Sequence, residues 1–309
     1  MNMYGHHLRY DLDFTTEEIW RVFELTKDLK RRVYTGEPHE LLKGKSLAMI
    51  FAKPSTHTRV SFEVGMTQLG GHALYLGPND LQLSRGETVA DTARVLSRFV
   101  NGIMARVFTQ NEIEELAAHA TVPVINGLSD MYHPCQALTD LFTVLEKRQA
   151  LKGLTMCFIG DGDNNVTNSL MLLSARLGIN FTVAAPKQYM TQKYILSIAK
   201  KEAIRTGAKI TLTNDPIAAV QRADIIHTDV WVSMGRTDVE ERKKILAPYQ
   251  VNEKLIKKAP AHALVMHCLP AHRGEEITDD VIDSPRSIVF DQAENRLHVQ
   301  KAIMALLMK

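Results

Sequence analysis

Residues 51–62 read FAKPSTHTRVSF, a stretch in which small hydroxyl and basic side chains separate two apolar segments. After Lys53 and Pro54 come four polar residues, Ser55, Thr56, His57 and Thr58. A helix that begins here directs unpaired backbone N–H groups and the positive end of its dipole toward the turn, which suits phosphate binding. Serine and threonine are also common helix N-caps. Taken alone, the stretch favours a helix cap, with a phosphate site as the functional alternative.

Comparable polar clusters follow other apolar runs. They are HPCQ at 133–136, GDGDNN at 160–165, DVWVSMG at 229–235 and HCLPAHRGEE at 267–276, while Arg106 lies within the apolar run at 102–107. Ligands of parallel α/β sheets bind beyond the carboxyl ends of the strands. Their repeated position after apolar runs therefore predicts that these clusters line a binding site.

Each cluster also has a simpler interpretation. GDGDNN resembles a dinucleotide fingerprint but lacks the third glycine. His133, His267 and His272 lack the short paired spacing of metal ligands, and no carboxylates are expected to cluster with them, so the sequence predicts no metal. Cys268 is either a buried apolar side chain or a reactive thiol.

The elements that must carry these clusters are strands alternating with amphipathic helices. Apolar runs predict strands at 46–51, 72–76, 102–107 and 122–126, and then at 154–160, 179–185, 209–214, 224–230, 263–269 and 287–290. The pattern predicts an α/β fold with two doubly wound parallel sheets that face one cleft. We expect domains at 1–150 and 151–309, with a last helix at 293–308 that packs back across both.

Composition excludes several classes of protein. The formal charge of +2 comes from mixed charges rather than basic blocks, so no nucleic-acid partner is expected. No apolar run is long enough to span a membrane. The three cysteines, Cys135, Cys157 and Cys268, have no close paired spacing, which indicates a reducing compartment. We expect a cytoplasmic protein that binds small anionic molecules.

In their order and intervals, the clusters resemble the carbamoyltransferases. The matching segments are KPSTHTRVSFE, ARV, HPCQALTDL, GDGDNNVTNS, DVWVSMG and HCLPAHRGEE. The phosphate turn and HPCQ are similar to those of both aspartate and ornithine carbamoyltransferases, whereas DVWVSMG and HCLP resemble the ornithine-specific members. The resemblance implies transfer of a carbamoyl group from carbamoyl phosphate to an amine, without a metal or another cofactor.

The resemblance also implies a set of residues that bind carbamoyl phosphate. They are Ser55, Thr56, His57, Thr58, Gln82, Arg106, His133, Gln136, Cys268, Leu269 and Arg296. Arg106, His133, Cys268 and Arg296 are the implied catalytic members. Gln82 is implied to reach the site of a neighbouring subunit, which makes a homotrimer, or an assembly of trimers, the active form.

The implied amine substrate is L-ornithine, whose δ-amine would be carbamoylated to give L-citrulline and phosphate. Its implied ligands are Asn165, Asp229, Ser233 and Met234. A carbamoyltransferase for putrescine or acetylornithine is the near alternative. A nicotinamide-dependent oxidoreductase and a non-catalytic anion-binding protein are the alternatives from other classes.

One position departs from the family. Members usually have STRTR where this chain has STHTR, so histidine replaces an arginine that binds phosphate. Arginine is always charged and can form bidentate hydrogen bonds with phosphate, whereas histidine ordinarily loses its charge near pH 6.5. We therefore expect weaker binding of carbamoyl phosphate than is usual in the family.

Overall fold

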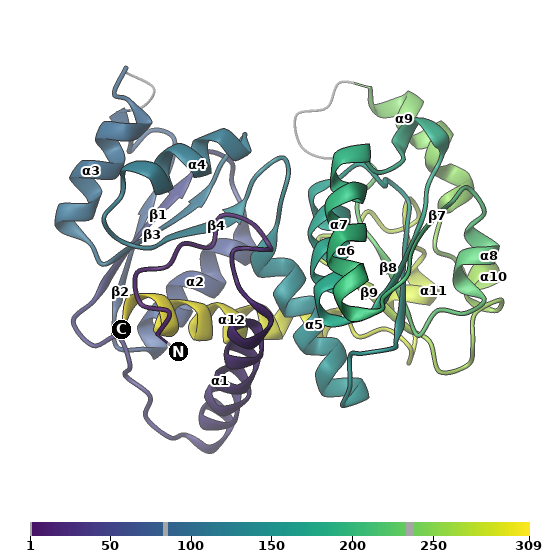
Figure 1. Ribbon diagram of the computed structural model, residues 1–309, viewed down its shortest axis with the longest axis horizontal. Coiled ribbons are helices and arrows are strands. Elements are labelled where there is room, and N and C mark those ends of the chain that lie inside the picture. The colour runs from purple at the N-terminus through teal and green to yellow at the C-terminus, as the bar shows by residue number, and fades with distance from the viewer. Residues whose placement is uncertain (1, 83–85, 233–237) are drawn as a thin grey trace. The chain divides into compact units, whose positions relative to one another are not determined.

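A computed structural model describes residues 2–82, 86–232 and 238–309. Contacts divide the chain into two compact units, one formed by 1–142 with 294–309 and the other by 143–293. Each unit contains one parallel sheet with helices packed against it (Figure 1). The predicted α/β fold with two parallel sheets is confirmed.

The first unit is built around a four-stranded sheet in the order β2-β1-β3-β4. Its strands are β1 (Ser46–Phe51), β2 (His72–Leu76), β3 (Gly102–Arg106) and β4 (Val124–Leu128). Its helices are α1 (Thr16–Thr35), α2 (Thr56–Gln68), α3 (Val89–Phe99), α4 (Gln110–His119) and the start of α5 (Pro134–Arg148). Strands β1 and β3 are continuous apolar runs because both their faces are covered.

Local sequence signals determine where α1 begins and ends. Thr15 and Glu18 form a capping box, in which each side chain accepts a hydrogen bond from the other residue's backbone N–H. Gly36 ends the helix with a φ of 69°, a left-handed conformation that glycine adopts without steric cost. The helix buries Ile19, Val22 and Phe23 on one face.

The second unit contains a five-stranded parallel sheet in the order β7-β6-β5-β8-β9. Its strands are β5 (Thr155–Ile159), β6 (Asn180–Ala184), β7 (Ile210–Thr213), β8 (Ile225–Thr228) and β9 (Leu264–His267). Its helices are α6 (Asn165–Leu177), α7 (Lys193–Thr206), α8 (Pro216–Val220), α9 (Val239–Leu246), α10 (Glu253–Ile256) and α11 (Asp279–Ile282).

The last helix, α12 (Val289–Met308), begins in the second unit and ends in the first (yellow in Figure 1). Its final turns pack on α2, where a side chain added at Gly65 would meet Met304 at 3.0 Å. The helix starts where the sequence predicts a strand at 287–290, and that prediction is wrong. Ser287 forms only an isolated bridge with Val265 before the helix begins. A four-residue apolar run does not distinguish a strand from a helix start.

No helix in the three described stretches combines the length and the apolar character needed to cross a membrane.

Candidate active site

Three neighbouring strands of the first unit bring separate polar clusters to one edge. Strand β1 pairs with β3 and β3 pairs with β4, all in parallel, so their carboxyl ends lie together. The turn before α2 follows β1, Arg106 ends β3, and His133 follows β4 shortly before α5. The strand-end pattern therefore gathers the predicted phosphate-binding residues of this unit.

The predicted strand-to-helix turn is present after β1. Ser55 is the N-cap of α2, and its hydroxyl oxygen accepts from the Thr58 N–H at 3.4 Å while donating to Thr58 Oγ1 at 3.1 Å. Thr56 and His57 occupy the exposed first turn. The cap and the phosphate-site interpretations are thus compatible, because the first turn still offers backbone N–H groups to an anion.

Two buried arginines give this region a positive charge. Arg106 is 9% exposed and Arg296, from α12, is 6% exposed. Burial lowers the pKa of His133 well below its usual value, and the charges of Arg296 and Arg106 lower it further. Burial and Arg106 likewise lower the pKa of Lys53. The region therefore suits an anion and keeps the His133 imidazole neutral.

Gln136 and Thr58 are both held by Arg296. The guanidinium donates from one nitrogen to Gln136 Oε1 and from the other to Thr58 Oγ1 at 3.2 Å. The last helix thus supplies a cation that ties α5 to α2 within the first unit. Gln82 is exposed and directly precedes residues 83–85, which lie outside the described part of the chain.

Because His133 is neutral in the folded protein, we expect the protein to lose stability at acidic pH. Below about pH 6.5 the unfolded chain binds a proton on this imidazole that the folded chain does not bind, so stability falls as pH falls. For each pH unit below 6.5, the free energy of unfolding of His133→Gln will fall by about 1 kcal/mol less than that of the wild type. Urea unfolding at pH values on both sides of 6.5 measures it.

The matched control is His72→Gln, at an exposed histidine in β2 of the same unit. We expect it to leave the wild-type pH dependence unchanged. The same steep acid loss in His133→Gln as in the wild type would show that the buried imidazole is protonated in the folded state.

The second unit gathers its polar clusters in the same way. Strands β5, β8 and β9 are neighbours in the sheet, and GDGDNN, Asp229 and His267–Leu269 lie at or just beyond their carboxyl ends. Asn164 caps α6 by accepting from the Thr167 N–H at 2.8 Å, which makes Asn165 the first residue of that helix. Gly162 has no room for a side chain, since a Cβ there would lie 2.9 Å from the Tyr189 carbonyl oxygen. Close packing thus accounts for this glycine without a dinucleotide.

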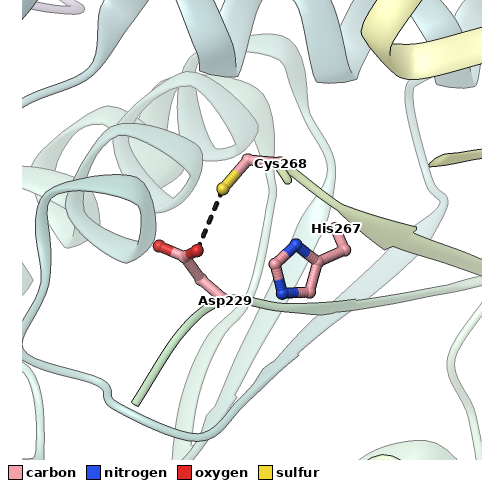
Figure 2. A group of neighbouring side chains, drawn as sticks. All are labelled: Asp229, His267 and Cys268. Carbon is pink, nitrogen blue, oxygen red and sulfur yellow. Dashed lines mark hydrogen bonds between the residues drawn. The ribbon is translucent and has the colours of Figure 1, made fainter. Parts of the chain in front are cut away.

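Asp229 and Cys268 contact each other at this edge (Figure 2). The thiol donates to Asp229 Oδ1 at 2.9 Å, and the Val230 N–H donates to the same oxygen at 2.8 Å. In the described part of the chain, both hydrogen bonds of this carboxylate go to Oδ1. Its second oxygen therefore remains available to a cationic ligand.

His267 lies beside this pair, but its ring nitrogens are both engaged. Nε2 is 3.1 Å from Glu276 Oε1, and Nδ1 accepts from the Leu269 N–H at 2.9 Å. Because Nδ1 accepts, a neutral ring carries its proton on Nε2 and donates it to the carboxylate. These bonds fix the turn that presents Cys268 and the Leu269 carbonyl group.

Asp229, His267 and Cys268 could each offer one ligand atom to a metal ion, with all three atoms within 4.8 Å of one another. The expectation from the sequence that no carboxylates cluster with the histidines is therefore wrong for His267. The engagement of both His267 nitrogens opposes ligation, because a metal would have to replace one of the two hydrogen bonds. His272, Glu275 and Glu276 form a second group of this kind.

A buried ion pair supports the same edge and was not predicted from the sequence. Arg242 of α9 pairs with Asp161, two residues beyond the end of β5, and both side chains are almost fully buried. The same guanidinium donates through Nε to the Trp231 carbonyl oxygen at 2.9 Å and lies over the Tyr189 ring. It thereby anchors the segment that follows Asp229. The predicted ligands Ser233 and Met234 lie outside the described residues.

Comparison with known proteins identifies the family. The model described as the aspartate/ornithine carbamoyltransferase carbamoyl-P binding domain matches residues 6–146, and the model of the Asp/Orn binding domain matches residues 152–307. The chain belongs to the aspartate/ornithine carbamoyltransferase family. The match over 6–146 lies mostly in the first unit, whereas the match over 152–307 includes most of the second unit and residues 294–307 of the first.

Similar members of the carbamoyltransferase family cover the whole chain. A protein of Pyrococcus furiosus named "Ornithine carbamoyltransferase, anabolic" is 56% identical over 309 residues, which are 100% of this chain and 98% of that protein. A solved ornithine carbamoyltransferase structure from Pyrococcus furiosus has a TM-score of 0.97 at 56% identity, covering 100% and 98% of the two chains. Another from Gloeobacter violaceus has a TM-score of 0.89 at 43% identity and covers both chains fully.

Proposed function

We propose that this carbamoyltransferase transfers the carbamoyl group of carbamoyl phosphate to the δ-amine of L-ornithine, giving L-citrulline and phosphate. The contact between Asp229 and Cys268 carries the proposal, because it joins the two segments that resemble ornithine-specific members. Asp229 offers a carboxylate to the α-ammonium group, and Cys268 lies beside it to position the δ-amine. In the proposed arrangement Asn165, Ser233 and Met234 complete the recognition of ornithine.

Carbamoyl phosphate is proposed to bind through the first unit. Ser55, Thr56, His57 and Thr58 would hold the phosphate at the start of α2, together with Arg106. Thr58, Arg106 and His133 would donate to the carbonyl oxygen, where negative charge develops during attack. Gln136, the Leu269 carbonyl group and Arg296 would hold the carbamoyl group.

The chemistry then needs one proton transfer. The neutral δ-amine attacks the carbonyl carbon, the bond to the phosphate oxygen breaks, and the phosphate leaves with the electron pair. The amine loses a proton in forming the new C–N bond, and the departing phosphate is the proposed acceptor. No base from the protein is required, so the buried His133 acts only as a hydrogen-bond donor.

A citrulline assay tests the function. With carbamoyl phosphate and L-ornithine, we expect equal amounts of citrulline and phosphate to form. Formation of neither product, together with oxidation or reduction of a nicotinamide cofactor, would instead support the oxidoreductase alternative.

The family resemblance further supports a homotrimer in which Gln82 of one subunit reaches the phosphate of another. Sedimentation equilibrium would distinguish a trimer from a monomer or a larger assembly of trimers. We also propose a cytoplasmic location, because three free cysteines are typical of a reducing compartment.

His57 is expected to weaken the phosphate site. Replacing His57→Arg will tighten carbamoyl phosphate binding by roughly tenfold, because a permanently charged donor pairs with the dianion. The wild type will bind more tightly as pH falls toward about 6.5, since histidine gains its charge there. Titration calorimetry of both proteins across this pH range measures the effect, and their difference removes the contribution of the substrate's own protonation.

His72→Arg, at an exposed histidine of the same unit, is the matched control for added charge. If His57→Arg binds carbamoyl phosphate no better than the wild type, this turn does not hold the phosphate through residue 57.

A further inference from the structure

A chain of buried hydrogen bonds extends beyond the predicted site residues of the first unit. Asp140 Oδ1 accepts from Gln136 Nε2 at 2.6 Å, and Gln136 Oε1 accepts from the Arg296 guanidinium. Asp140 is completely buried and Gln136 is 1% exposed. Water is therefore largely excluded from these bonds, and each polar group depends on its protein partner.

The two neighbours of Gln136 determine which way its amide faces. A guanidinium group only donates hydrogen bonds, and a carboxylate group only accepts them. If the amide were turned over, its NH₂ group would face Arg296 and its oxygen would face Asp140. Both contacts would then be repulsive. The charges on either side thus favour one orientation, with the amide oxygen toward Arg296.

Helix geometry explains how Asp140 reaches Gln136. The two residues are four positions apart on α5, so their side chains lie on the same face, one turn from each other. The hydrogen bond between them joins two residues of the same helix, whereas Arg296 reaches Gln136 from α12. Asp140 can therefore act on a ligand through the amide of Gln136.

We propose that Asp140 is a positioning residue that makes the site selective for a carbamoyl group. The proposal rests on the proposed function, in which Gln136 accepts from the NH₂ of carbamoyl phosphate. An amide oxygen has two lone pairs, so it accepts from Arg296 and from the substrate NH₂ together. A substrate with a methyl group in place of NH₂ offers no donor, so the second lone pair of that oxygen has no partner. Sites built to bond a substrate N–H discriminate strongly against analogues that lack it.

Two stable phosphonates make the test direct. Phosphonoacetamide carries an NH₂ group on its carbonyl carbon, and acetonylphosphonate carries a methyl group there. Titration calorimetry without ornithine gives the dissociation constant of each, and their ratio is the preference of the protein for NH₂. Inorganic phosphate, which has no acyl group, reports the anion site alone.

Two substitutions alter Asp140 to different degrees. Asp140→Leu removes the acceptor, and we expect the preference for phosphonoacetamide to fall by about tenfold, the effect of one lost hydrogen bond. Asp140→Asn keeps an oxygen that accepts from Gln136 but loses the charge, so its preference will fall by roughly threefold. Phosphate affinity will change by less than twofold in both variants.

Thr139→Val is the matched control, because it removes a buried hydroxyl that donates to the Cys135 carbonyl oxygen at 2.7 Å on the same helix. We expect it to keep the wild-type preference. An unchanged preference in the Asp140 variants, or an equal loss of affinity for both phosphonates, would show that Asp140 is only structural. If Asp140→Leu does not fold, an unchanged preference in Asp140→Asn is sufficient to reject the proposal.

Measurements on the wild type distinguish a failure of the proposed function from a failure of the proposed role of Asp140. A wild-type protein that forms no citrulline and binds neither phosphonate contradicts the function itself. A wild-type protein that forms citrulline and prefers phosphonoacetamide, with variants that retain this preference, contradicts only the role of Asp140.

Discussion

Replacing Asp229→Asn will lower kcat/KM for ornithine by roughly 30- to 5,000-fold, equivalent to about 2 to 5 kcal/mol. Asparagine keeps an oxygen that accepts from the Val230 N–H and the Cys268 thiol, so the change removes the charge and little else. The lost interaction is the attraction between a nearly buried carboxylate and the α-ammonium group. Steady-state kinetics with varied ornithine measures the loss.

Carbamoyl phosphate binding provides the internal comparison. We expect the affinity of Asp229→Asn for phosphonoacetamide to stay within twofold of the wild type, because Asp229 is proposed to contact only the amine substrate. Asp280→Asn, at an exposed carboxylate in α11, controls for the change in net charge. Equal loss of phosphonate and ornithine binding in Asp229→Asn would contradict the assignment.

Arg106→Met is expected to have an effect of similar size on the other substrate. The arginine is nearly buried at the carboxyl end of β3, and it is proposed to contact both the phosphate and the carbonyl oxygen. Its removal will reduce kcat/KM for carbamoyl phosphate by roughly 30- to 5,000-fold. We expect kcat itself to fall as well, since the interaction with the carbonyl oxygen strengthens in the transition state.

Arg94→Met is the corresponding control, at an exposed arginine in α3 of the same unit. Its kinetic constants should match those of the wild type. A normal kcat in Arg106→Met, with only a higher KM, would place Arg106 on the phosphate alone and remove it from the carbonyl oxygen.

Most of the fold was predictable because buried parallel strands are continuous apolar runs. The strand at 72–76 matches β2 in both bounds. The strand expected at 122–126 lies two residues further on, at Val124–Leu128, because Pro123 has no N–H to donate to the sheet. The run at 287–290 was misassigned, since its apolar residues begin α12.

The strand-end rule located the polar clusters but not the contacts between them. Asp229 and Cys268 are 39 positions apart, and they meet because β8 and β9 happen to be adjacent in the sheet. Arg242 and Asp161 are separated by 81 positions and carry no local signal of their pairing. Asp140 did have a local signal, because its four-residue spacing from Gln136 places the two side chains on one face of a helix.

The identity of the amine is tested most directly by competition. Equal concentrations of L-ornithine, putrescine and N-acetylornithine are mixed with the protein and limiting carbamoyl phosphate, and the carbamoylated products are separated and quantified. Putrescine lacks the α-carboxylate, and N-acetylornithine lacks the α-ammonium charge that Asp229 is proposed to bind. We therefore expect citrulline as nearly the sole product. Carbamoylputrescine or N-acetylcitrulline as the main product, with little citrulline, would contradict it.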